Sequence, residues 1–80
     1  MNIDQAVKEL TIMLLYLTSW QEKKPEVYQR SWKGYDFDTL NKLEDDGMIY
    51  GSHRSKSVVI YEEGIEMATQ LLKKYNLPVP

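Results

Sequence analysis

The sequence predicts an α+β domain of three main helices with a two-stranded β-hairpin between the last two. Apolar residues recur at helical spacing over about 3–20 and about 62–75, and a shorter helical pattern covers 36–46. Gly47–Gly64 has the pattern of a strand, a polar turn, a second strand and a helix start. We expect residues 1–80 to form a single domain, with 77–80 as a frayed tail.

The first predicted helix, Ile3 to about Trp20, carries more apolar surface than one small core needs. Asn2 or Asp4 can cap its start. One set of apolar residues alternates spacings of four and three, namely Ile3, Val7, Leu10, Leu14 and Leu17. A second set widens this stripe, namely Ile12, Met13, Leu15, Tyr16 and Trp20. Either the helix is central and buried on most sides, or its excess face is a homodimer seam, because these spacings also build coiled coils.

The middle of the chain predicts an irregular connection. Residues 21–26 are a polar break ended by Pro25. Residues 27–35 are short, aromatic and closed by Gly34, so we expect an irregular or single-turn element there, with Trp32 and Tyr35 filling space.

In the second half of the chain, capping residues mark the ends of the second helix, and a hairpin and the last helix follow. Asp36 is the expected N-cap of the second helix, whose buried face would be Phe37, Leu40 and Leu43. Gly47 suits the left-handed position that ends this helix. In the hairpin, Ile49 would face the core, residues 52–55 would turn, and Val58 and Ile60 would share one face. In the last helix the apolar stripe would be Ile65, Ala68, Leu71, Leu72 and Tyr75.

Composition limits the classes of function. The 80 residues include no cysteine, which excludes disulfides and thiolate metal sites, and the net charge is −2. The longest apolar run, 12–17, is too short to cross a bilayer, and no signal peptide is recognisable, so we expect a cytoplasmic protein without membrane contact. A small domain without disulfides or thiolate metal sites often gains stability from a partner chain.

The run from Leu40 to Tyr75 resembles the second half of a winged-helix domain. The resemblance rests on the sequence pattern Leu43-x-x-x-Gly47-x-Ile49, followed by a wing and then by Val58-x-Ile60-x-x-x-Gly64-Ile65-x-x-Ala68. Bacterial regulators of the multiple-antibiotic-resistance and phenolic-acid types are similar in this part. Nearly the whole chain also resembles a family of small uncharacterised bacterial proteins, on the first helix, RSWKGYDFDTLNKL and GSHRSKSV. These resemblances imply a winged-helix-like fold, a bacterial origin and no particular activity.

Two departures from the regulator pattern bear on DNA binding. Tyr61 stands where a capping threonine is usual before the last helix. The helix that normally opens the helix-turn-helix motif and crosses the phosphate backbone is replaced by the short segment 27–35.

The candidate DNA-binding residues lie on the hairpin tip and the second helix. His53, Arg54 and Lys56 make the tip basic, and Asn41 and Lys42 could contact base edges. From Arg30 to Lys56, however, five basic residues are balanced by five acidic ones. An ordinary solvated hairpin tip is the alternative interpretation.

A second candidate surface interleaves cations with aromatic rings, at Arg30, Trp32, Lys33 and Tyr35. Such a cluster can stack on bases or anchor a protein interface. It can also be structural, with the rings in the core or at its rim and a cation lying over a ring.

Enzyme chemistry has little support in the sequence. His53 is the single histidine, and the acidic residues at helix starts are explained by capping and the helix dipole. We expect no catalytic residues, no metal and no cofactor.

The leading hypothesis is a binding module for double-stranded DNA that forms a homodimer through the first helix. The alternative is a protein-interaction or adaptor domain of winged-helix shape that binds no DNA.

Overall fold

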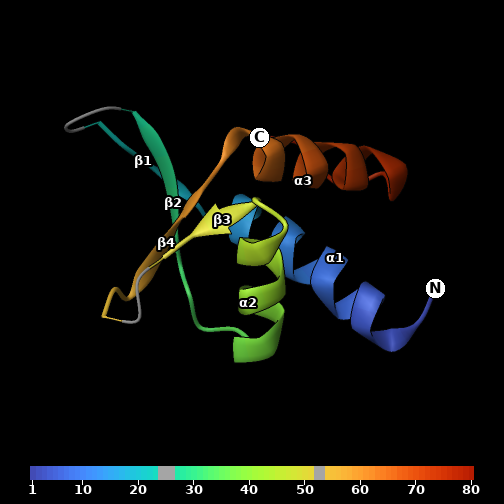
Figure 1. The fold of residues 1–80 in the computed structure, drawn as a ribbon. Coiled ribbons are helices and arrows are strands. Elements are labelled where there is room, and N and C mark those ends of the chain that lie inside the picture. The colour runs from blue at the N-terminus through green and yellow to red at the C-terminus, as the bar shows by residue number, and fades with distance from the viewer. Residues whose placement is uncertain (24–26, 52–53) are drawn as a thin grey trace.

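Helices alternate with pairs of strands along the chain in the computed structural model, which describes residues 1–23, 27–51 and 54–80. The elements, in order, are α1 (Ile3–Leu17), β1 (Trp20–Glu22), β2 (Tyr28–Trp32), α2 (Phe37–Asp45), β3 (Ile49–Tyr50), β4 (Ser57–Ile60) and α3 (Glu62–Lys74). The strands in the described ranges form one antiparallel sheet in the order β1-β2-β4-β3. Figure 1 shows the described helices on one side of this sheet. The α+β class with three helices is thus confirmed.

The predicted hairpin is present as β3 and β4, but it is not an isolated wing. It is half of a sheet with four strands in the described residues, because β2 pairs with β4 and β1 pairs with β2. The expectation of an irregular element at 27–35 was therefore wrong: Tyr28–Trp32 is a strand in the middle of the sheet. The polar break expected at 21–26 also begins inside β1, and Lys24, Pro25 and Glu26 lie outside the described residues.

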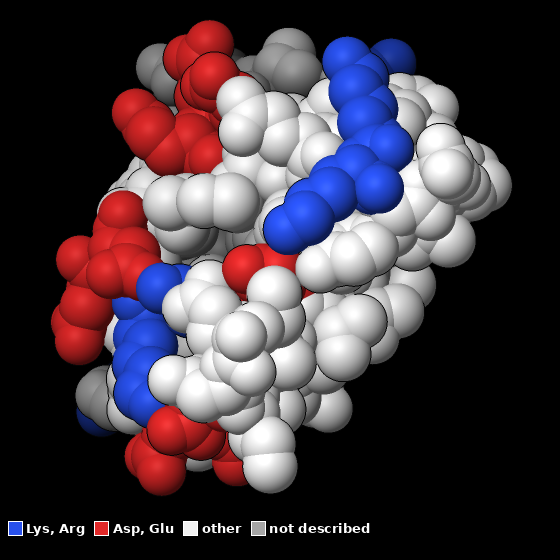
Figure 2. All heavy atoms as spheres, turned by 90° about the vertical axis from the view of Figure 1, so that its right-hand side faces the viewer, with Lys and Arg blue, Asp and Glu red and all other residues white. Residues whose placement is uncertain are grey.

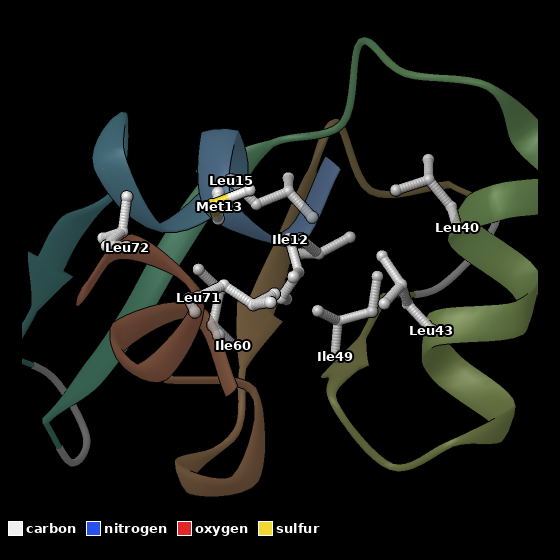
Figure 3. Close-up of a cluster of buried hydrophobic side chains, with 11 residues drawn as sticks. Ile12, Met13, Leu15, Leu40, Leu43, Ile49, Ile60, Leu71 and Leu72 are labelled. Carbon is white, nitrogen blue, oxygen red and sulfur yellow. The ribbon is translucent and has the colours of Figure 1, made fainter. Parts of the chain in front are cut away.

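The core lies between the helices and the inner face of the sheet. Ile49, Val58 and Ile60 point from the strands toward the helices and are buried. Figure 3 shows Ile49 and Ile60 converging with leucines from α2 and α3 and with residues of α1. The buried set comprises Ile12, Met13, Leu15, Leu40, Leu43, Ile49, Val58, Ile60, Ala68, Leu71 and Leu72.

Helix α1 is capped as expected but turns a different face to the core. The Asn2 side chain accepts a hydrogen bond from the Gln5 backbone N–H at 2.8 Å, so Asn2 is the N-cap. The helix ends at Leu17, because Trp20 already belongs to β1. The expectation that this helix is buried on most sides was wrong. Ile12 and Leu15 are buried, whereas the side chains at alternating spacings of four and three are all exposed to solvent.

Helix α2 is delimited by the predicted caps. Asp36 accepts hydrogen bonds from both the backbone N–H and the hydroxyl of Thr39. Gly47, at φ 76°, takes the left-handed conformation after the helix. Leu40 and Leu43 are buried as predicted, but Phe37 is 60% exposed, because it lies in the first turn, beyond the core, at the rim of a pocket.

Helix α3 packs closely on the hairpin at its first turn. Tyr61 precedes the helix and makes no side-chain cap, in agreement with the sequence. A Cβ atom added to Gly64 would stand 2.3 Å from the Met48 carbonyl oxygen, so this contact requires glycine. The C-terminal side differs from the prediction at Tyr75, which is 44% exposed, while Ala68 and Leu72 are fully buried. Beyond the helix, the Leu77 N–H donates to the Leu72 carbonyl, so the predicted frayed tail begins with an ordered turn.

Candidate interaction surfaces

The candidate DNA-binding residues lie on the hairpin and on α2, and one of them lines a pocket. Arg54 and Lys56 are exposed between β3 and β4, whereas His53 lies outside the described residues. Asn41 and Lys42 are exposed on α2, and Asn41 lines a pocket of about 390 Å³ between α2 and the hairpin. Its walls are Lys33, Phe37, Leu40, Asn41, Glu44, Ile49, Tyr50, Gly51 and Val58.

Acidic residues accompany these cations. Asp38 and Asp45 are exposed on α2, and Asp46, the exposed residue that caps its C-terminal end, forms an ion pair with Lys8 of α1. On the face of the molecule in Figure 2, acidic side chains gather along one edge and basic ones appear at separate places, with uncharged surface between them. Figure 2 views the helix side of the molecule, whereas the connection between β3 and β4, which carries Arg54 and Lys56, lies on the opposite side in Figure 1. The exposed acids of α2 would repel phosphates near that helix.

The structure separates the predicted cluster of cations and aromatic rings into two groups. Arg30 and Trp32 point to the face of the sheet that no described helix covers, called here the outer face. Lys33 instead lines the pocket on the inner side, and its backbone N–H donates to the Lys56 carbonyl. Tyr35 is half-buried and packs against the core. The four residues therefore do not form one surface.

The outer face is rich in aromatic rings that the sequence prediction did not bring together. Its strand residues are Trp20, Glu22, Tyr28, Arg30, Trp32, Tyr50, Ser57 and Val59. Trp32 is 62% exposed and packs on Trp20, with ring centroids 4.9 Å apart. On the other side of the face, the ring centroids of Tyr50 and Tyr61 are 6.5 Å apart. The period-two alternation of Tyr28, Arg30 and Trp32 is the sequence signal for this arrangement.

The second uncovered surface is the α1 stripe, defined as Ile3, Val7, Leu10, Leu14 and Leu17. These side chains are 80%, 37%, 56%, 46% and 39% exposed. Leu10 and Ile12 are two residues apart, which is about 200° around a helix, so the stripe is opposite the core contact. The N-terminal end of α1 reaches past the other elements in Figure 1. An apolar row of this length on a free helix face is typical of a contact with another chain.

Two kinds of site, a metal centre and a membrane span, have no candidate in the described part of the chain. Among residues 1–23, 27–51 and 54–80, no group of three or more His, Cys, Asp or Glu side chains is placed to hold a metal ion. Across the same residues, no helix has both the length and the apolar character that spanning a bilayer demands.

Comparison with known proteins identifies one family. A family model with the description "Domain of unknown function (DUF6429)" matches residues 3–77. No curated protein and no solved structure gives a significant match. The match agrees with the expected small domain family of unknown function, and it assigns neither a winged-helix fold nor a ligand.

Proposed function

We propose that this chain, which belongs to the family described as Domain of unknown function (DUF6429), is a non-enzymatic protein-interaction module that pairs with a second copy of itself through the α1 stripe. The observation that carries the proposal is the exposure of five large apolar side chains at spacings of four, three, four and three. This is the repeat of a coiled-coil seam, in which equivalent side chains of two helices interlock.

The surroundings of the stripe favour an identical partner. The charged residues of α1 are Asp4, Lys8 and Glu9, and in a helix their positions fall outside the half that is centred on the stripe. Two identical stripes therefore meet without like charges across the contact. The helix extends over about 22 Å, which gives the seam about two heptads. Burying a fully exposed leucine or isoleucine contributes about 1.5–3 kcal/mol, so several partly exposed ones add up to a substantial driving force.

The test is the molar mass of the full chain by light scattering after size exclusion. We expect twice 9.4 kDa for the native sequence at tens of micromolar. Leu10→Glu, at the centre of the stripe, should give 9.4 kDa with an unchanged circular dichroism spectrum, because it buries a charge only in the dimer. Gln70→Glu adds the same charge on the exposed side of α3 and should stay dimeric. A native chain of monomer mass would contradict the proposal.

Binding of double-stranded DNA is a second candidate, favoured by the exposure of Arg54 and Lys56 on the hairpin tip. A phosphate contact from this tip predicts duplex binding that weakens as salt rises. The double substitution Arg54→Ala and Lys56→Ala should then abolish a gel shift at low salt, while Lys73→Ala and Lys74→Ala, at the end of α3, should preserve it. No shift of the native chain at low salt would remove this candidate.

A further inference from the structure

The outer face of the sheet is uncovered like the α1 stripe, but the chemistry of its side chains differs from that of the stripe. One row of side chains crosses the four strands of the described sheet, with Trp20, Arg30, Val59 and Tyr50 paired by register. At a strand spacing of about 4.8 Å, this row spans roughly 14 Å. Its ends are aromatic and its middle holds a cation.

Arg30 is held in a fixed orientation in this row. Its Nε and Nη2 atoms donate to the Ser57 hydroxyl at 3.2 and 3.0 Å. Among the described strand residues that point to the outer face, it is the single basic one, and Glu22 at the β1 edge is the single acidic one. The Trp20 indole Nε1 donates to the Glu22 carboxylate at 3.3 Å, so this acid has its own partner within β1. The centre of the face is thus positive and surrounded by rings.

This pattern selects among three occupants. A second copy is disfavoured, because a two-fold axis through the centre would bring Arg30 close to its own equivalent. A nucleic acid would need several cations along its phosphates, whereas the described strand residues of this face supply one. Tryptophan, tyrosine and arginine together, with other charges depleted, are the composition of protein-interface centres.

We propose that the outer face docks a protein segment that presents one carboxylate to Arg30 between apolar side chains that pack on Trp32 and Tyr50. This proposal rests on the proposed function as a protein-interaction module, and it uses a different surface from the α1 stripe. The guanidinium matches a carboxylate in charge and planar geometry, and the flanking rings exclude water from the pair.

The experiment uses the full chain and a phage-displayed library of random twelve-residue peptides. Selection on the immobilised chain should enrich peptides with an Asp or Glu flanked by aromatic or aliphatic residues. A synthetic copy of the enriched peptide should shift the tryptophan emission, because both tryptophans of the chain, Trp20 and Trp32, lie on this face. A selection that yields no binders, or peptides without acidic enrichment, overturns the proposal.

Matched variants locate the contact. Arg30→Gln should weaken the peptide about tenfold or more, and replacing the peptide's acid by its amide should weaken it equally, with no further loss when both changes are combined. Lys73→Gln, on α3, should leave the affinity unchanged. The proposal is overturned if Arg30→Gln and Lys73→Gln change the peptide affinity equally. It is also overturned if a ten-nucleotide oligo-dT binds more tightly than the peptide and its binding depends on Arg30. The Leu10→Glu variant should keep peptide affinity, so failure of dimerisation and failure of docking are distinguishable.

Discussion

Leu14 and Leu15 are neighbours in α1 and meet opposite surroundings. Leu15 is 0% exposed, between the sheet and the other helices, and Leu14 is 46% exposed on the far side of the same helix. Each side has enough apolar residues to be a core face, since Ile12, Met13 and Leu15 face inward and the α1 stripe faces outward. The difference shows that helical periodicity identifies apolar faces, while the other elements of the fold decide which face becomes the core.

The largest predicted effect compares these two leucines directly. Leu15→Ala should lower the free energy of unfolding by about 2–5 kcal/mol, because it leaves a cavity in the core. Leu14→Ala should cost less than about 1 kcal/mol when both are measured in the Leu10→Glu background, where dimerisation makes no contribution. Urea unfolding followed by circular dichroism measures both values. Equal losses would mean that α1 packs with a different face inward.

A second comparison sharpens the contrast between closely packed and open backbone. Gly64→Ala should destabilise the fold by about 1–3 kcal/mol, because the new Cβ would overlap the Met48 carbonyl oxygen, 2.3 Å away. Gly34→Ala meets no atom within 4 Å and should be neutral or slightly stabilising. Thermal unfolding of both variants is the measurement. A tolerated Gly64→Ala would show that α3 does not approach the hairpin this closely.

The smallest of these effects concerns the cap of α2. Asp36→Ala removes the acceptor of two hydrogen bonds from Thr39 and should cost about 1 kcal/mol in unfolding free energy. Asp36→Asn retains an acceptor and should recover most of that loss. Urea midpoints of the native chain and both variants test the cap, and a midpoint of Asp36→Ala equal to the native one would show that Asp36 does not hold the helix start.

Local chemistry made several features predictable. Asn2, Asp36 and Gly47 marked helix ends because capping depends on one or two residues. The alternation Val58 and Ile60 predicted β4 because both inward positions are apolar. These are features for which the sequence contains the whole physical cause.

Features that depend on distant partners were not predictable. Strand β2 was missed because its inward position at the centre is Ser31, which is 0% exposed and lies 3.3 Å from the Thr18 hydroxyl. A polar residue at a buried position hides the alternation that marks a strand. The candidate cluster at 30–35 was split for the same reason, since only a strand sends Arg30 and Trp32 to one face and Lys33 to the other.

The most direct test of the α1 stripe as a self-contact is site-specific cross-linking. The chain has no cysteine, so Leu10→Cys introduces a single thiol. Leu10 is the middle residue of the stripe, and a two-fold axis through the centre brings it to its own equivalent in either helix orientation. We predict a disulfide-linked dimer on mild oxidation of Leu10→Cys at low micromolar concentration, and monomer from Gln70→Cys. Equal cross-linking of the two variants, or none at position 10, would contradict pairing through α1.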